Sequence, residues 1–254
     1  MSTRHTPTPD SALMLLTISS GAVDAISFIT FGKVFTAFMT GNFVFLGLAA
    51  THAFEHGGPS VLRVCLVLVA FAGGAFLAAR IMRRFRRSWL RDHGVAVTLS
   101  GVLVVEVIFL AGWIAVGGDP GDSAATALAI VLALAMGMQT AAVGALDIKS
   151  VFTTAVTATF LNLAREAADR KSSGTDPARL AKIVVSLIAG AAAGGLLIVH
   201  APEVAGVLPP VATALALAVG LRGELRGGSP ATAGDGSIVV EAAATRSLGS
   251  ARGA

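Results

Sequence analysis

The chain has 254 residues, of which 54% are hydrophobic and only 13% are charged. Soluble domains carry about 25% charged residues, so this composition excludes a soluble protein and predicts an all-α integral membrane protein that partners with a lipid bilayer. The formal net charge of +4 and the pI near 10.0 do not indicate a nucleic-acid partner, because the basic residues of membrane proteins gather in loops and report orientation.

Six apolar runs are long enough to cross about 30 Å of hydrocarbon as helices. Two further stretches, 34–51 and 150–164, are richer in Thr and Asn and follow their predecessors after very short polar breaks. The sequence therefore predicts a polytopic helical membrane protein with six full crossings and two broken or re-entrant segments. The six predicted crossings are 12–31, 61–82, 96–116, 124–143, 181–200 and 205–221.

A single transmembrane domain is expected over residues 11–222. The composition changes after it, because residues 223–254 are mostly Gly, Ser, Ala and Thr with scattered charges and no helical periodicity. Such segments are typically disordered, since they cannot bury enough apolar surface to fold. Residues 1–10 are expected to form a similar disordered tail.

Basic residues predict the orientation of the chain in the membrane. The loop from Arg80 to Arg91 and the segment from Arg165 to Lys182 carry clusters of Arg and Lys, as cytoplasmic loops do. The linkers 117–123 and 200–204 carry neither residue and are expected outside. We therefore expect both termini to lie in the cytoplasm.

This placement of the loops fixes the number of crossings in each half. Residues 12–51 and residues 124–164 must each make one net crossing, so the Thr-rich stretches 34–51 and 150–164 would dip into the membrane and return, or extend a broken helix. If instead all eight stretches cross fully, the basic segment around Arg170 faces outward, against the positive-inside tendency.

The two halves of the chain resemble each other. The segment 21–49 aligns with 137–164, and 63–70 aligns with 182–189. A run of Gly and Ala follows both 63–70 and 182–189. Within the first pair, Gly21 falls on Gly137, Phe35 on Phe152, Thr36 on Thr153 and Thr40 on Thr157. We predict two repeats, 11–116 and 124–222. Because the first begins inside and the second outside, they would have inverted topology, as in many secondary transporters.

Two carboxylates stand inside predicted crossings, where a charge costs about 2.5–3.5 kcal/mol on insertion scales. Asp24 is predicted to be a protonatable or cation-coordinating group in a central cavity; the alternative is a carboxylate that caps a helix end or pairs with Lys33. Glu106 lies near the middle of its run and must face protein or water. It is predicted to face the same interior as Asp24 and to take part in proton coupling, the alternative being a structural hydrogen bond between helices.

Hydroxyl and amide side chains recur one helical turn apart in both Thr-rich stretches. They are Thr36, Thr40 and Asn42 in the first half and Thr153, Thr157 and Asn162 in the second. At an interface between repeats such faces could bind a polar solute. The alternative is that each Thr bonds back to its own helix or across to a neighbour.

Other features predict packing or nothing specific. The small-residue runs 70–74 and 190–195 permit close contact between helices. His52 and His56 stand four residues apart but have no third ligand nearby, so we predict no metal site. The chain contains no phosphate-binding Gly loop, Cys pair or nucleophile elbow, so we expect no enzymatic activity and no cofactor.

The segments Gly21 to Phe28 and Val34 to Asn42 resemble the YoaK-like family of uncharacterised bacterial membrane proteins, also called domain of unknown function 1275. The family's hallmark, an Asp in the first helix followed by Phe-Thr-x-x-Met-Thr-Gly-Asn, is similar to Asp24 and residues 35–42 of this chain. The similarity covers roughly residues 11–222. It implies a bacterial inner-membrane protein and supplies no substrate and no catalytic residue.

Two functions remain open from the sequence. The first is a small-solute transporter or channel that binds an unknown small solute between the repeats. The second is a non-transporting scaffold or partner-binding protein whose polar groups only hold helices together. A homo-oligomer is compatible with either function.

Overall fold

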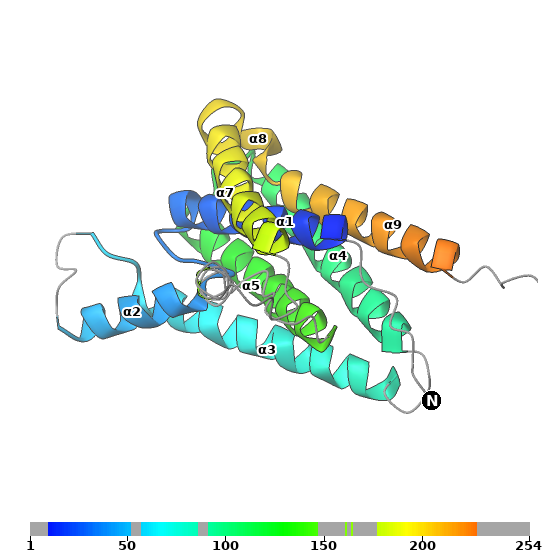
Figure 1. Cartoon of the computed structure of the whole chain (residues 1–254). Coiled ribbons are helices and arrows are strands. Elements are labelled where there is room, and N and C mark those ends of the chain that lie inside the picture. The colour runs from blue at the N-terminus through cyan, green and yellow to red at the C-terminus, as the bar shows by residue number, and fades with distance from the viewer. Residues whose placement is uncertain are drawn as a thin grey trace, which may run out of the picture.

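The computed structural model describes residues 10–51, 57–85, 91–146, 161, 164 and 177–227, and the regular elements in these ranges are helices (Figure 1). Six spans in this part of the chain are long and apolar enough to cross a membrane, the sixth formed by two consecutive helices over Pro202–Arg222. The predicted class, a polytopic helical membrane protein, is confirmed. The helices are α1 (Asp10–Thr30), α2 (Met39–Ala50), α3 (Val61–Phe85), α4 (Arg91–Ala115), α5 (Asp122–Ala145), α7 (Pro177–His200), α8 (Pro202–Ala205) and α9 (Leu208–Gly227).

Contacts among Phe31, Arg63, Trp113 and Pro202 bring several helix ends together; we call this the Trp113 end of the bundle. The carbonyl of Phe31, just after α1, accepts a hydrogen bond from Nη1 of Arg63 at the start of α3, at 2.8 Å. The Phe31 ring packs edge-on against Trp113 in the last turn of α4. The indole Nε1 of Trp113 donates to the carbonyl of Pro202, just after α7, at 2.9 Å.

The remaining ends follow from two ion pairs. Arg63 also pairs with Asp122 in the first turn of α5, which places the start of α5 at the Trp113 end. At the opposite end, Arg179 in the first turn of α7 pairs with Asp10 in the first turn of α1, with Nε and Oδ1 2.7 Å apart. Helices α1, α4 and α7 therefore run towards the Trp113 end, and α3, α5 and α9 run away from it.

Helix α2 does not add a crossing. Because α1 ends and α3 begins at the Trp113 end, the chain between them enters and leaves the bundle at that same end, and α2 packs against α3 (Figure 1). Residues 12–51 thus make one net crossing, as the charge pattern predicts. The stretch 150–164, apart from Leu161 and Ala164, lies outside the described residues.

The helices extend beyond the predicted apolar runs because hydropathy marks the bilayer and not the helix end. Helix α9 continues through the charged residues Arg222, Glu224 and Arg226 to Gly227. Residues 223–227 were expected in the disordered tail and are helical instead. Residues 1–9 and 228–254, the rest of the two expected tails, lie outside the described residues.

Glycines bring α1 and α7 into backbone contact. A Cβ atom added to Gly21 of α1 would lie 2.2 Å from the carbonyl oxygen of Leu187 in α7, and one added to Gly190 of α7 would lie 2.1 Å from that of Ile18 in α1. Real Cβ atoms do not come this close to backbone. The small-residue run 190–195 therefore permits close helix contact, as predicted.

Helices α3 and α5 make the same kind of contact. A Cβ on Gly137 of α5 would lie 2.0 Å from the carbonyl oxygen of Phe71, and one on Gly74 of α3 would lie 2.1 Å from that of Leu134. Each residue of this contact stands 116 positions from a residue of the α1–α7 contact: Gly137 corresponds to Gly21, and Gly74 corresponds to Gly190.

The Arg residues at the starts of α3 and α7 follow the same spacing. Nε of Arg63 donates to Oγ1 of Thr126 at 2.9 Å, and Nε of Arg179 pairs with Asp10, which is 116 residues before Thr126. The predicted alignment of Arg63 with Lys182 is therefore wrong by three residues, and Arg179 is the counterpart of Arg63. In a run of small apolar residues a slip of three keeps the same helix face, so the sequence alone does not fix the register.

Candidate functional site

The chain reverses direction directly after α1. Gly32 and Lys33 adopt left-handed backbone conformations, with φ of 75° and 63°. Such a conformation favours Gly, and a Cβ at position 32 would also lie 2.3 Å from Nη1 of Arg63, so that the Arg63 side chain would have to shift. Residues 31–38, which we call the return segment, then run back along α1. The ring of Phe35 stacks on that of Phe28 with centroids 5.0 Å apart.

Asp24 holds the tip of the return segment. Its Oδ1 accepts hydrogen bonds from three consecutive backbone N–H groups, those of Thr36 at 3.0 Å, Ala37 at 2.8 Å and Phe38 at 3.3 Å. These groups stand directly before α2, where backbone N–H groups lack helical partners and the helix dipole favours a negative charge. Lys33 is not the partner of Asp24, since its Nζ donates to the carbonyl of Gly57 at 2.7 Å.

Asn42 and Thr36 support the same segment from within. The buried Asn42 accepts the N–H of Phe35 through Oδ1 at 3.0 Å and donates to the carbonyl of Phe35 through Nδ2 at 2.6 Å. The buried hydroxyl of Thr36 donates to Oγ of Ser27 on α1 at 3.4 Å. Both side chains therefore satisfy polar groups of a non-helical segment at membrane depth, where unsatisfied backbone is costly.

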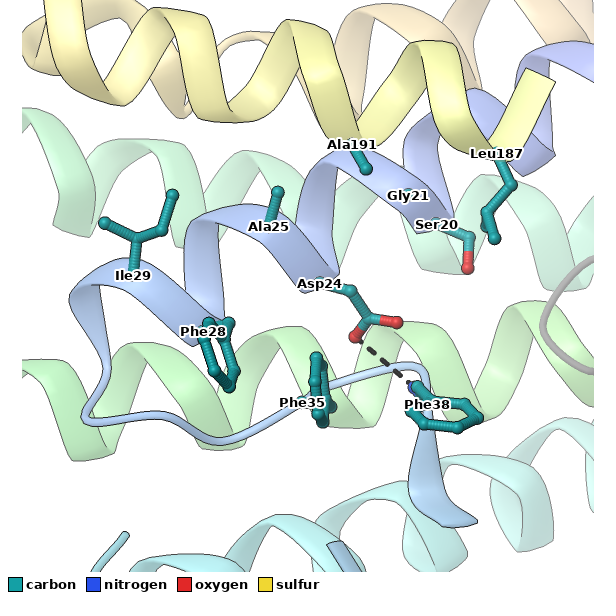
Figure 2. Close-up of a pocket in the computed structure, with 10 residues that line it drawn as sticks. All are labelled: Ser20, Gly21, Asp24, Ala25, Phe28, Ile29, Phe35, Phe38, Leu187 and Ala191. Atoms are coloured by element: carbon teal, nitrogen blue, oxygen red, sulfur yellow. Dashed lines mark hydrogen bonds between the residues drawn. The ribbon is translucent and has the colours of Figure 1, made fainter. Parts of the chain in front are cut away.

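A pocket of about 470 Å³ opens between α1, the return segment and α7 (Figure 2). Most of its wall is apolar, and its two polar side chains are those of Asp24 and Ser20. The second carboxylate oxygen of Asp24 makes none of the three bonds to the return segment and turns towards the open space (Figure 2). The wall is formed by Ser20, Gly21, Asp24, Ala25, Phe28, Ile29, Phe35, Phe38, Leu187 and Ala191.

The predicted solute-binding residues separate into different places. Asp24 lines the pocket, whereas Thr36 and Asn42 stabilise its wall from behind. Thr40 is exposed and does not belong to the pocket wall. The second-half members of the predicted set, Thr153, Thr157 and Asn162, lie outside the described residues.

Sequence reasoning missed Ser20 and the aromatic residues of the wall. Ser20 stands four residues before Asp24 and so shares its helix face, a spacing that could have found it. The hydroxyl of Ser20 is buried and has no hydrogen-bond partner among the described residues. Phe35 was noted only as a repeat and family position, and Phe28 and Phe38 carried no signal, because apolar residues do not stand out in a membrane-spanning chain.

Glu106 of α4 lies in a second buried polar cluster, beside Ser19 of α1 and Thr213 of α9. Its side chain is fully buried between helices, so it faces protein and not lipid, as predicted, but it does not line the Asp24 pocket. Oε1 accepts a hydrogen bond from Ser19 at 3.4 Å, and Thr213 of α9 lies beside the carboxylate. Within the described part of the chain, Oε2 has no hydrogen-bond partner.

This cluster continues along the contact between two groups of helices. Helices α1, α7 and α9 pack together, as do α3, α4 and α5, and the groups meet chiefly between α4 and α9, with a smaller contact between α1 and α5. Besides Glu106, the buried Gln139 of α5 bridges them, because its Nε2 donates to the carbonyl of Leu16 in α1 at 3.1 Å. The seam between the groups is thus polar at its centre.

Six membrane-length spans, a return segment and buried carboxylates define a polytopic integral membrane protein. A family model described as protein of unknown function DUF1275 matches residues 12–220, and the chain belongs to this family. The chain is also 29% identical over 161 residues to the UPF0700 transmembrane protein YoaK of Bacillus subtilis (strain 168), an alignment that covers 63% of this chain and 68% of the relative. No solved structure matches the chain. The predicted family resemblance is confirmed.

Proposed function

We propose that the protein is a small-solute transporter or channel of the bacterial inner membrane, with no enzymatic activity, and that the Asp24 pocket binds the solute. The observation that carries this proposal is the second carboxylate oxygen of Asp24, which accepts none of the three bonds from the return segment and faces a pocket of about 470 Å³ beside a membrane-length helix. Holding the return segment uses only the other oxygen. An intramembrane charge that faces a cavity is typical of a solute or ion pathway.

We further infer that the two halves are inverted repeats and that the pocket lies between them. The glycine and Arg contacts recur at a separation of 116 residues, and the helices of one half run opposite to their counterparts in the other. The pocket wall combines α1 and the return segment of the first half with Leu187 and Ala191 of the second. Sites at such interfaces serve alternating access, because one repeat can rock against the other.

Glu106 is assigned to proton coupling within this proposal. It lies where the two groups of helices meet, and one of its oxygens has no partner among the described residues. A carboxylate in this position would bind or release a proton as the seam opens to water, because a buried unpaired charge is strongly disfavoured. Glu106 is linked to the pocket through α1, because its hydrogen-bond partner Ser19 directly precedes Ser20 of the pocket wall.

The test is to profile solutes taken up and released by cells that lack the gene, and by the same cells with the wild-type or the Asp24→Asn protein. We expect at least one solute to change with the wild type and to revert with Asp24→Asn. The exposed Asp119→Asn is the matched control and should behave as wild type. If deleting the gene leaves the solute profile unchanged and instead removes a binding partner, the result would favour a scaffold. In a scaffold, Asp24 would only hold the chain before α2.

The proposed orientation, with both termini in the cytoplasm, is tested by labelling single cysteines in a Cys65→Ser background. Ser60→Cys and Asp119→Cys lie at the Trp113 end and should react with a membrane-impermeant maleimide in intact cells. Arg83→Cys, near the other end of α3, should react only after the membrane is permeabilised. Labelling of Ser60→Cys and Asp119→Cys from opposite sides would overturn the arrangement.

A further inference from the structure

The groups that face the Asp24 pocket define the chemistry of what it binds. Resting on the proposed transport function, we propose that the solute is a small organic cation, a protonated amine with an apolar body. The argument uses the charge of the pocket, its aromatic wall and the small number of its polar groups.

The pocket carries a negative charge that no basic side chain in the described structure neutralises. The described ion pairs join Arg63 to Asp122 and Arg179 to Asp10, and neither involves Asp24. Lys33, the nearest basic residue in sequence, points its Nζ to the carbonyl of Gly57. A cationic ligand would neutralise the carboxylate, and an anionic one would meet a like charge at close range.

Aromatic rings form the wall nearest to the carboxylate (Figure 2). Phe35 is central, because it stacks on Phe28 at 5.0 Å and meets Phe38 edge-to-face at 5.4 Å between ring centroids. The faces of such rings are negative and attract ammonium groups, most strongly where water is excluded. The same rings also bury the apolar body of a ligand.

Among the described residues that line the pocket, two have polar side chains, and both suit an ammonium group. Asp24 offers a carboxylate oxygen, and Ser20, one helical turn earlier on α1, offers a hydroxyl with no partner among the described residues. An N–H donor placed between them would satisfy both. A sugar would leave most of its hydroxyls unpaired on the apolar wall, and a divalent cation needs six to eight oxygen ligands. The cavity volume of about 470 Å³ lies within the range typical of small-molecule sites.

The experiment measures binding to the purified full-length protein in lipid nanodiscs by titration calorimetry. Three probes of one shape differ in charge: 2-phenylethylamine is cationic at neutral pH, 2-phenylethanol is neutral and phenylacetate is anionic. We expect the amine to bind at least about tenfold more tightly than the other two, because only the amine pairs with the desolvated carboxylate. Asp24→Asn should remove this preference while keeping an oxygen for the three N–H groups, and Asp119→Asn should not.

A second pair of variants separates the aromatic wall from general packing. Phe38→Leu should weaken amine binding several-fold, whereas Phe43→Leu, on an exposed face of α2 outside the pocket wall, should not. Equal binding of the three probes, or amine binding that is unchanged in both Asp24→Asn and Phe38→Leu, would overturn the proposal.

Flux in proteoliposomes distinguishes this inference from the proposed function. Amine binding that depends on Asp24 without amine movement across the membrane would contradict transport and leave the cation site standing. Movement of a neutral or anionic solute that depends on Asp24 would contradict the cation and leave transport standing. Accumulation of the amine by wild type, lost in Asp24→Asn, would support both.

Discussion

Replacing Gly74 of α3 by Ala should separate α3 from α5, because these two helices make backbone contact at this glycine. The new Cβ would lie 2.1 Å from the carbonyl oxygen of Leu134 and 2.9 Å from its carbonyl carbon. Ordinary contacts of Cβ atoms begin near 3.4 Å. The backbones of α3 and α5 must therefore move apart by about 1.3 Å at this point, because neither contact atom belongs to a flexible side chain.

The adjacent Gly73 provides a matched control. A Cβ there meets nothing within 4 Å among the described residues, so Gly73→Ala should be neutral or stabilising. Ala is favoured over Gly in a helix by about 1 kcal/mol, and this gain is common to both variants. The difference between them therefore isolates the steric cost, which we expect to be about 2 kcal/mol or more, as for other overpacked cores.

Thermal unfolding of the purified protein in nanodiscs measures this difference. A chain of this length shifts its Tm by about 2–4 °C per kcal/mol, so Gly74→Ala should melt about 4–8 °C below Gly73→Ala. Gly190→Ala, the counterpart in the α1–α7 contact, should show a similar loss because its Cβ would lie 2.1 Å from the carbonyl oxygen of Ile18. If Gly74→Ala and Gly73→Ala melt at the same temperature, the close contact of α3 and α5 is refuted.

Three further variants test the supports of the site. Arg63→Met should lower the free energy of unfolding by about 3 kcal/mol, because hydrogen bonds to charged groups contribute about 1.5–3 kcal/mol each. Asp122→Asn, at a side chain that is 93% exposed, should change it by less than about 1 kcal/mol, and equal denaturation midpoints for the two variants would contradict this difference. Asn42→Asp should cost about 1–3 kcal/mol, since Asp cannot donate to the buried carbonyl of Phe35, and wild-type stability would contradict that bond. Glu106→Gln should fold normally but give solute flux that no longer responds to an imposed pH gradient, and a preserved response would remove Glu106 from coupling.

The sequence predicted those features that contrast with an apolar background. Asp24 and Glu106 stood out because charged groups are costly in a membrane; Glu106 is fully buried between helices and Asp24 is partly buried at the pocket. The basic loops predicted that residues 12–51 cross once, since loop charge records the side of the membrane. The runs 70–74 and 190–195 predicted close packing because Gly lacks the atoms that would keep helices apart.

Features made of apolar residues or of backbone could not be predicted in this way. The rings of Phe28, Phe35 and Phe38 resemble many other apolar side chains in the sequence, and their meeting depends on the reversal at Gly32 and Lys33. The contact between Asp24 and the return segment depends on three N–H groups that come into reach only after this reversal. Tertiary geometry, not local composition, decides both.

The spacing of 116 residues also supports our proposal of a single site between two repeats. Both halves keep the glycine contacts and the Arg at the start of α3 or α7, so the parts that hold helices together are common to them. The polar groups of the pocket do not recur in the second half. The residues 116 positions after Ser20 and Asp24 are Met136 and Thr140, and neither is charged. A carboxylate needed only for packing would be expected in both halves. Its presence in one half supports the proposal that Asp24 serves the pocket, to whose wall the second half contributes Leu187 and Ala191 of α7.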